Sequence, residues 1–260
     1  MGAGRKAAAL GKKVVMMENR VIGGTCVNVG CVPKKVMFNL ANFLEEAHMM
    51  KEYGVNGTEG LQLDFKTFKE KRDAYVKRLN DIYKSNVAKA EMTYVEGTCS
   101  FVDDHTVEAS GVRYTAPHIL IASGSTPAEN EFPGSDLCMN SDGFFEMEEL
   151  PESMVVIGGG YIGIELAQIL QALGVKVTLL IRSIPLRLVD RDICEVLLEN
   201  MAKLGLDVRL HTPHEGVTKN DDGSLNVILK DGTSIRADKC LVALGRPPNI
   251  EPLKLGNTGI

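Results

Sequence analysis

Residues 23–35 read GGTCVNVGCVPKK, and the rest of the chain is organised around this stretch. Two cysteines, Cys26 and Cys31, are separated by four residues and preceded by a glycine pair. Pro33 favours the first turn of a helix, and apolar residues then recur at helical spacing at Val36, Leu40, Phe43, Leu44 and Ala47. The pattern predicts a helix that starts at about Cys31, with Cys26 just before it.

These two cysteines can meet only where the backbone bends. On a regular helix, residues five positions apart lie about 8 Å apart, which is beyond the reach of a disulfide. Asn28 and Gly30 tolerate the required bend. A helix N-terminus, Lys34 and Lys35 would each lower the pKa of a nearby thiol. We therefore expect a pair that opens and closes rather than a structural disulfide.

The spacing by itself leaves other interpretations open. A lone C-x4-C is often incidental, and a zinc site would need a second pair of ligands. The remaining cysteines are scattered singly along the sequence, at Cys99, Cys138, Cys194 and Cys240. The five histidines show no metal-like pairing, and His211 and His214 are expected in a loop, so no metal site is predicted.

Composition narrows the class of protein. A chain of 260 residues is long enough for two domains, and 44% hydrophobic with 24% charged residues is typical of a globular protein. The net charge of −5 argues against nucleic-acid binding. No run of 18 apolar residues and no signal peptide are visible, and six cysteines do not make a secreted disulfide framework. We expect a cytoplasmic protein, with a mitochondrial form as the alternative.

A glycine-rich loop opens the second half of the chain. The apolar residues 154–157 predict a strand that runs directly into GGGYIG at 158–163, followed by an amphipathic helix. G-x-G-x-x-G in this context is typical of a dinucleotide site, with the pyrophosphate on the helix N-terminus. The predicted cofactor-binding residues of this loop are Gly158, Gly160, Tyr161, Ile162 and Gly163.

The strand expected at 176–181 ends where an NAD-binding protein usually has an acidic residue. This chain has Arg182 there, and Arg187 follows five residues later. Arginine at this place accommodates a 2′-phosphate, so the predicted nucleotide is NADPH. The alternative is a pair of exposed loop arginines.

The first half is predicted to form part of a second dinucleotide-binding unit. A helix is expected over 2–10 and a strand over 13–18 that ends in Glu18, the place of the carboxylate that binds a ribose. A solvated strand end is the alternative for Glu18. A long helix is expected over 64–90, short strands over 92–97, 100–109, 112–115 and 118–125, and a hinge loop over 127–151.

Several of these stretches resemble the flavoprotein disulfide reductases, and most closely the glutathione reductases. The resemblance rests on GGTCVNVGCVPKK at 23–35, FKEKRDAYVKRLNDIYKSN at 68–86, ILIASG at 119–124 and VALGRPPN at 242–249. It implies an α/β fold with two Rossmann-like dinucleotide-binding domains, each with a small antiparallel β meander. The implied domains are an incomplete FAD-binding domain at 1–124, an NADPH-binding domain at 125–248 and the start of a returning segment at 249–260.

The resemblance also implies a reaction and the residues that perform it. NADPH reduces FAD, the flavin reduces the Cys26–Cys31 disulfide, and Cys26 attacks a substrate disulfide while Cys31 lies nearer the flavin. Lys34, paired with Glu165, would stabilise the reduced flavin, and Tyr161 would gate the nicotinamide. Further cofactor-binding residues implied by position are Glu18, Gly24, Thr25, Ala122, Ser123, Gly124, Glu165, Gly245 and Arg246.

Glutathione disulfide is the substrate that the resemblance implies, in a homodimer. The matching contact residues are Arg5, Ile82, Tyr83 and Asn86, and an arginine suits a substrate carboxylate. From the residues alone, Tyr83 packing in a core and a solvated Arg5 remain the alternatives.

Members of this class are longer at both ends. We therefore expect the first strand with its glycine loop, and the partner-supplied acid–base histidine, to lie outside these 260 residues, and expect little turnover from them alone. A non-enzymatic NADP-binding fragment is the second hypothesis. Dihydrolipoamide dehydrogenase is the alternative within the class, although it usually has an acidic residue where this chain has Arg182.

Overall fold

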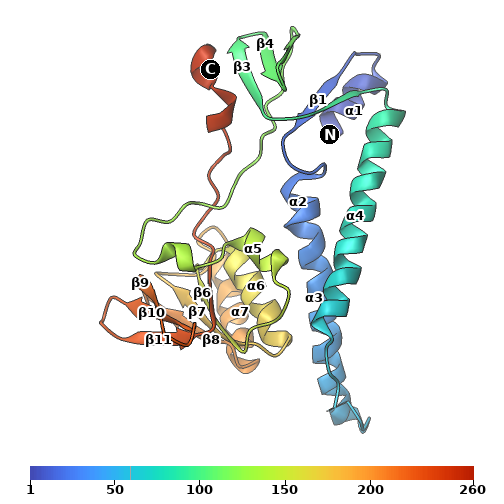
Figure 1. The fold of residues 1–260 in the computed structure, drawn as a ribbon. Helices are drawn as coiled ribbons and strands as arrows, with labels where there is room; N and C mark the ends of the chain where they lie inside the picture. Colours follow the sequence, from blue (N-terminus) through green and yellow to red (C-terminus); the bar gives the residue numbers. More distant parts are fainter. Residues whose placement is uncertain (59) are drawn as a thin grey trace. The chain divides into compact units, whose positions relative to one another are not determined.

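The computed structural model describes residues 1–58 and 60–260, which form two compact units that are each described by themselves (Figure 1). The two long helices α3 (Cys31–Met49) and α4 (Phe65–Lys89) each contribute residues to both units. The first unit consists of Met1–Val32, Arg72–Thr126 and Pro247–Ile260, and the second of Pro33–Lys71 and Pro127–Arg246. No helix among the described residues is long and apolar enough to span a membrane.

A four-stranded parallel sheet forms the centre of the second unit. Its order is β12-β6-β7-β8, with β6 at Ser153–Ile157, β7 at Lys176–Ile181, β8 at Asp207–Leu210 and β12 at Lys239–Val242. Helices α6 (Tyr161–Ala172) and α7 (Arg191–Lys203) lie along this sheet (Figure 1). Parallel strands covered by helices are nearly continuous apolar runs, and residues 154–157 of β6 are at most 2% exposed. The strands predicted at 154–157 and 176–181 are therefore confirmed.

An antiparallel meander packs against this sheet. Strands β9 (His214–Lys219), β10 (Leu225–Leu229) and β11 (Ser234–Ala237) pair in the order β11-β10-β9. Their turns contain Gly223 and Gly232 with φ of 87° and 84°, a conformation that glycine adopts without strain. Each turn carries an Asp-Gly pair, at 222–223 and 231–232, which is a common sequence signal for a hairpin. Because His214 begins β9, its expected place in a loop is wrong.

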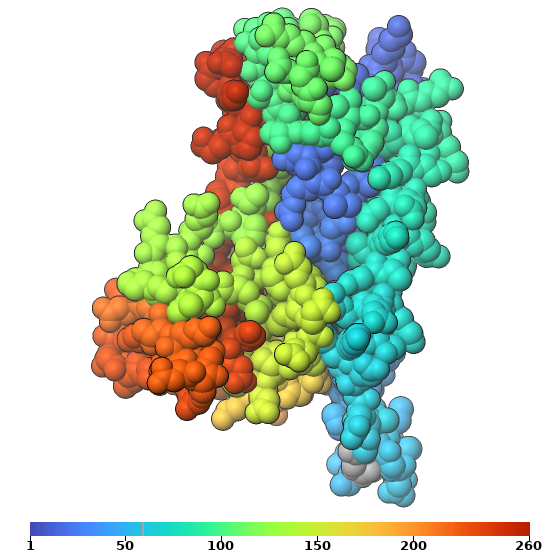
Figure 2. Space-filling view, viewed as in Figure 1, coloured from blue at the N-terminus to red at the C-terminus, as the bar shows by residue number. Residues whose placement is uncertain are grey.

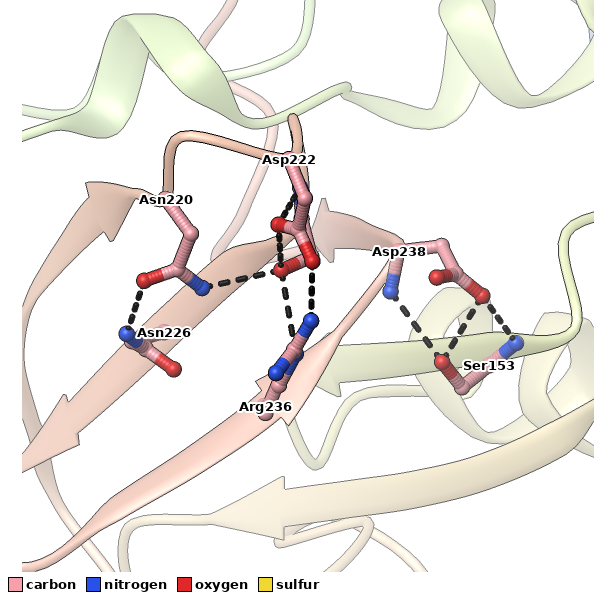
Figure 3. Close-up of polar contacts among 7 residues, drawn as sticks. Ser153, Asn220, Asp222, Asn226, Arg236 and Asp238 are labelled. Carbon is pink, nitrogen blue, oxygen red and sulfur yellow. Dashed lines mark hydrogen bonds and ion pairs between the residues drawn. The ribbon is translucent and has the colours of Figure 1, made fainter.

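Polar clusters close the meander and attach it to the parallel sheet (Figure 3). In the first cluster, Ser224 donates to Asp222 Oδ1 at 2.6 Å and accepts from Arg236 Nε at 3.1 Å, while Arg236 also pairs with Asp222. In the second, Asp238 Oδ2 accepts from the backbone N and the hydroxyl of Ser153 at 2.8 and 2.9 Å. This second cluster joins the residue before β12 to the first residue of β6.

The first unit contains a two-stranded parallel sheet, in which β1 (Val15–Glu18) pairs with β2 (Thr93–Glu96). Helix α1 (Gly2–Ala9) precedes β1. Ile22, Val87 and Met92 form a small buried core, against which Ala8 of α1 and Met16 of β1 pack. A second antiparallel meander follows, with β3 at Cys99–Asp103, β4 at Thr106–Ala109 and β5 at Val112–Thr115.

The chain returns to the first unit near its end. The short 3-10 helices at Glu251–Leu253 and Leu255–Asn257 bring the Asn257 side-chain amide 2.8 Å from the Phe101 carbonyl. The α/β fold with a parallel sheet and two small antiparallel meanders agrees with the sequence prediction.

Two sequence expectations fail in the connecting segments. Residues 118–124 form no strand, and Leu120 is 72% exposed. An apolar run becomes a strand only where a neighbouring strand is available to pair with it. Among the described residues, the only β-pairing of this stretch is the isolated bridge of Ser125 to Pro248. The expected loop 127–151 contains a 3-10 helix at Ser135–Leu137 and helix α5 (Ser141–Glu146). Asn140 caps α5 by accepting from the Asp142 and Gly143 amides at 2.9 and 3.1 Å.

Candidate functional site

The two cysteines of the GGTCVNVGCVPKK stretch lie on either side of a sharp break between helices. Cys26 belongs to the short helix α2 (Gly24–Asn28), and Cys31 is the first residue of α3, as the sequence predicts. The backbone breaks at Val29, with φ −137° and ψ 41°. A Cβ at Gly30 would lie only 2.7 Å from the carbonyl oxygen of Thr25. Glycine is therefore needed at this position for close approach of the backbone.

Cys26 and Cys31 are exposed, free thiols, and Cys31 lies close enough to shift the pKa of Cys26. The neighbouring Cys31 thiol, followed by burial, raises the pKa of Cys26 above its ordinary value. The expected lowering is therefore wrong for Cys26. Both lysines have other partners: Lys34 pairs with Glu165, and the Lys35 ammonium lies 4.4 Å from the centre of the Phe38 ring.

Two asparagines hold α2 in place. The Asn28 side-chain amide donates to the Gly24 carbonyl at 2.9 Å and to the Ile22 carbonyl at 3.3 Å. Asn80, on α4, donates to the Ile22 carbonyl at 2.8 Å and to Asn28 Oδ1 at 3.0 Å. Asn80 was not singled out from the sequence, because its partners lie more than 50 residues away along the chain. It ties the turn that carries Cys26 to α4.

Lys34 and Glu165 form an ion pair across the second unit. Lys34 Nζ lies 2.9 Å from Glu165 Oε1, and the two side chains are 24% and 42% exposed. Glu165 is on α6, behind the glycine-rich loop, and Lys34 is three residues beyond Cys31 on α3. The contact that the resemblance implies is thus present.

The three motif glycines of the second-unit loop, Gly158, Gly160 and Gly163, meet different steric demands. Gly158 has φ of 139°, and a side chain there would overlap the Ala243 carbonyl. A Cβ at Gly163 would overlap the Gly158 carbonyl, whereas a Cβ at Gly160 would meet nothing within 4 Å. Gly158 thus allows the tight turn, Gly163 allows close packing of helix against strand, and Gly160 leaves space for a pyrophosphate. The loop therefore fits a dinucleotide.

The two predicted arginines lie on the loop after β7. Arg182 and Arg187 are exposed, and Arg187 donates to Ser183 Oγ at 2.8 Å. The Leu186 amide donates to the Gly159 carbonyl at 2.8 Å, which holds this loop against the glycine-rich loop. Two cationic side chains are thereby presented beside the candidate pyrophosphate site.

A third arginine, which the sequence did not single out, also holds the loop after β7. Arg191, the first residue of α7, donates to the Pro185 carbonyl at 3.1 Å and to the Val189 carbonyl at 2.6 Å. Its position directly after the Asp190 helix cap was a usable signal for a loop-closing role.

Arg246 has protein partners. Its guanidinium lies 3.2 Å from Ser141 Oγ and 3.8 Å from Asp142 Oδ1, and its side chain is 14% exposed. These contacts hold α5 against the segment after β12. Gly245, with φ of 136°, provides the preceding turn, and its carbonyl accepts from the Ala128 amide at 3.0 Å.

The remaining predicted site residues lie in the first unit. Glu18 ends β1 and accepts from the Arg20 amide at 3.0 Å, while Gly24 and Thr25 open α2. Ala122, Ser123 and Gly124 lie in the extended segment without a strand, and the Gly124 carbonyl accepts from the Asn249 amide at 2.9 Å. The roles of these residues stay predictions.

The predicted substrate residues are carried by α1 and α4. Arg5 is exposed on α1, and Ile82, 44% exposed, lies one turn before the half-buried Asn86 on α4. Tyr83 packs partly against the Ile22 and Val87 core. Among residues 1–58 and 60–260, no group of three or more potential ligands could hold a metal ion.

The chain belongs to the pyridine nucleotide-disulphide oxidoreductase family, whose model matches residues 1–260. It is 36% identical over 270 residues to a glutathione reductase of Schizosaccharomyces pombe, and 37% identical over 277 residues to one of Yarrowia lipolytica. Both alignments cover 100% of this chain, which spans 58% and 59% of the two relatives.

A solved structure supports the same class. The HOCl-induced flavoprotein disulfide reductase RclA from Escherichia coli superposes with a TM-score of 0.85 at 25% identity, over 100% of this chain and 57% of RclA. The family's name couples a pyridine nucleotide to disulphide chemistry, and RclA is a flavoprotein.

Proposed function

We propose that this protein is an NADPH-dependent reductase of glutathione disulfide, with FAD between the nucleotide and the Cys26–Cys31 pair. The observation that carries the proposal is the contacting thiol pair at the break between α2 and α3. It occurs in a chain that aligns over its whole length with two glutathione reductases. FAD binding, the homodimer and the domains at 1–124 and 125–248 are part of the same proposal.

The thiol pair performs the exchange with substrate. Cys26, as thiolate, attacks one sulfur of glutathione disulfide, breaks the S–S bond and releases one glutathione thiolate. Cys31 then attacks the Cys26 sulfur, releases the second glutathione and leaves a Cys26–Cys31 disulfide. FAD, when bound and reduced by NADPH, supplies the two electrons that reopen this disulfide.

The other residues bind and orient. Gly158, Gly160 and Gly163 shape the pyrophosphate site, and Arg182 and Arg187 favour a nucleotide with a 2′-phosphate. Lys34, held by Glu165, supplies a positive charge one turn beyond Cys31. In the first unit, we assign substrate contacts to Arg5, Ile82, Tyr83 and Asn86.

The decisive experiment uses the protein expressed from its complete gene. We expect flavin absorbance in the purified protein and NADPH oxidation that depends on glutathione disulfide and is lost in Cys26→Ser. Cys194→Ser is the matched control, because this buried thiol lies on α7, outside the site. Preference for dihydrolipoamide with NAD⁺ would replace the substrate assignment. NADPH binding without flavin or turnover would instead favour a nucleotide-binding module.

A further inference from the structure

Cys138 and Cys240 are far apart in the sequence but lie side by side in the second unit. The Met139 amide donates to the Cys240 carbonyl at 2.9 Å, and the Val242 amide donates to the Met139 carbonyl at 2.8 Å. These bonds form a parallel bridge between Met139 and Leu241. Two cysteines that are scattered singly along the sequence are therefore neighbours in the fold.

The register of this bridge places the two cysteines opposite one another. In a parallel pair, the residues that precede Met139 and Leu241 are also opposed, and both lie on the same face. Neighbouring strands lie about 4.8 Å apart, which falls within the Cα separation of about 4.4–6.8 Å that a disulfide requires. Cys138 and Cys240 can therefore be bridged without a large backbone movement.

The two thiols differ in accessibility. Cys240 is 1% exposed and packs in the core with Val155 and Val217. Cys138 is half-buried at the edge of that core, with its sulfur 3.8 Å from the Gly134 carbonyl oxygen. An oxidant can therefore reach Cys138 first, with Cys240 directly behind it.

The electrostatics support the same order. The neighbouring Cys240 thiol lowers the pKa of Cys138. The same contact, followed by burial in the apolar core, raises the pKa of Cys240. A reachable thiol that ionises more readily, backed by a protonated one, is the arrangement of an attacking and a resolving cysteine.

We propose that Cys138 and Cys240 form a second oxidation site, distinct from the Cys26–Cys31 pair, at which a peroxide closes an intramolecular disulfide. The Cys138 thiolate attacks hydrogen peroxide and breaks the O–O bond, which gives a sulfenic acid and hydroxide that takes up the thiol proton as water. The Cys240 sulfur then attacks the Cys138 sulfur, and its proton leaves with the hydroxyl group as a second water. Two thiols lose two electrons, and the peroxide becomes two waters.

The disulfide would fasten the segment before α5 to β12. This segment already contacts the meander, since the Val217 amide donates to the Pro133 carbonyl at 2.9 Å, and in Figure 2 it covers part of the orange meander surface. The crosslink would enclose β6 through β11 in one covalent loop. Closing so long a loop restricts the unfolded chain and stabilises the folded one.

The test treats the full chain, reduced and freed of reductant, with equimolar hydrogen peroxide in a Cys26→Ser/Cys31→Ser background. Free thiols are then alkylated in urea, which exposes the buried cysteines, and the chain is digested without reductant. We expect a peptide containing Cys138 linked to one containing Cys240, with Cys99 and Cys194 still alkylated. The melting midpoint should rise by several degrees and return after reduction.

Single variants check the order of attack. Cys240→Ser should leave Cys138 as a sulfenic acid that dimedone labels, whereas Cys138→Ser should give no label at Cys240. The proposal would be overturned if Cys138 and Cys240 were both alkylated after peroxide treatment of the folded chain. A link from Cys138 to any other cysteine or chain would also overturn it. The linked-peptide measurement on the background protein stands even where a single variant fails to fold.

Discussion

The side-chain amide of Asn80 donates to Oδ1 of Asn28 at 3.0 Å, and Asn28 in turn holds the carbonyl oxygen at the start of α2. The same Asn80 amide reaches the Ile22 carbonyl at 2.8 Å. Two short side chains thus fix the turn that carries Cys26 to the helix that carries Ile82 and Asn86. A shift of α4 would therefore move the turn that carries the Cys26 thiol.

Replacing Asn80 should loosen this turn. Asn80→Leu keeps the volume but leaves part-buried acceptors without their donor, which costs about 1–3 kcal/mol. We expect a lower free energy of unfolding in urea and faster alkylation of Cys26 in the folded chain. Asn130→Leu is the matched control, since the Asn130 amide donates to a carbonyl in the second unit. Equal alkylation rates in the two variants would show that Asn80 does not position α2.

The two loop glycines should separate nucleotide binding from stability. Gly163→Ala overlaps the Gly158 carbonyl, and such overpacking typically costs about 1–3 kcal/mol. Gly160→Ala faces open space at φ −81°, so its free energy of unfolding should change by less than about 0.5 kcal/mol. NADPH titration should nevertheless show weaker binding to Gly160→Ala, because the methyl group occupies the approach of the pyrophosphate. Unchanged binding would remove Gly160 from the site.

Arg182 and Arg187 should set the nucleotide preference. Charge-assisted hydrogen bonds contribute roughly 1.5–3 kcal/mol each, so Arg182→Leu/Arg187→Leu should weaken NADPH binding about a hundredfold or more. NADH binding should change little. The control is Arg209→Leu, which removes an exposed arginine already paired with Asp207. Equal losses for NADPH and NADH would contradict the assignment.

The reactivity of Cys26 should have a distinctive pH profile. Because the Cys31 thiol raises the pKa of Cys26 above its ordinary value, the folded chain favours the protonated form. This stabilisation is present below the pKa of the unfolded chain and is lost as pH rises through the higher folded pKa. Alkylation of the reduced chain should therefore reach half-maximal rate at a higher pH in buffer than in urea.

Removing the Cys31 thiol should bring the pKa of Cys26 back towards its ordinary value. In Cys31→Ala the largest contribution to the raised pKa of Cys26 is gone, so its alkylation midpoint should move down towards the value measured in urea. A midpoint that stays high in Cys31→Ala would assign the shift to burial instead.

Local signals in the sequence predicted the central elements well. Strands β6 and β7 are uninterrupted apolar runs next to glycine, and α3 begins at Cys31 as the position of Pro33 indicates. The apolar run at 119–122 misled because a strand also needs a backbone partner, which periodicity does not report. The pairing of Lys34 with Glu165 came from resemblance alone, since 131 residues separate them.

Other features depend on tertiary register. Cys138 meets Cys240 only because Met139 bridges to Leu241, and no spacing rule connects these positions. The raised pKa of Cys26 likewise arises from a close thiol neighbour rather than from the lysines nearby in sequence. Contacts of this kind are properties of the assembled fold.

The strand order β12-β6-β7-β8 also bears on how the second unit is made. Strand β6 is synthesised first among the four, yet one of its two neighbours, β12, is synthesised last. During synthesis, the edge of β6 that pairs with β12 therefore stays unpaired until α6, α7 and the whole meander have left the ribosome. Ser153, which Asp238 engages just ahead of β12, marks the place where the late strand docks. A nascent chain stalled before β12 should be protease-sensitive, and release of that strand should complete the sheet in a single cooperative step.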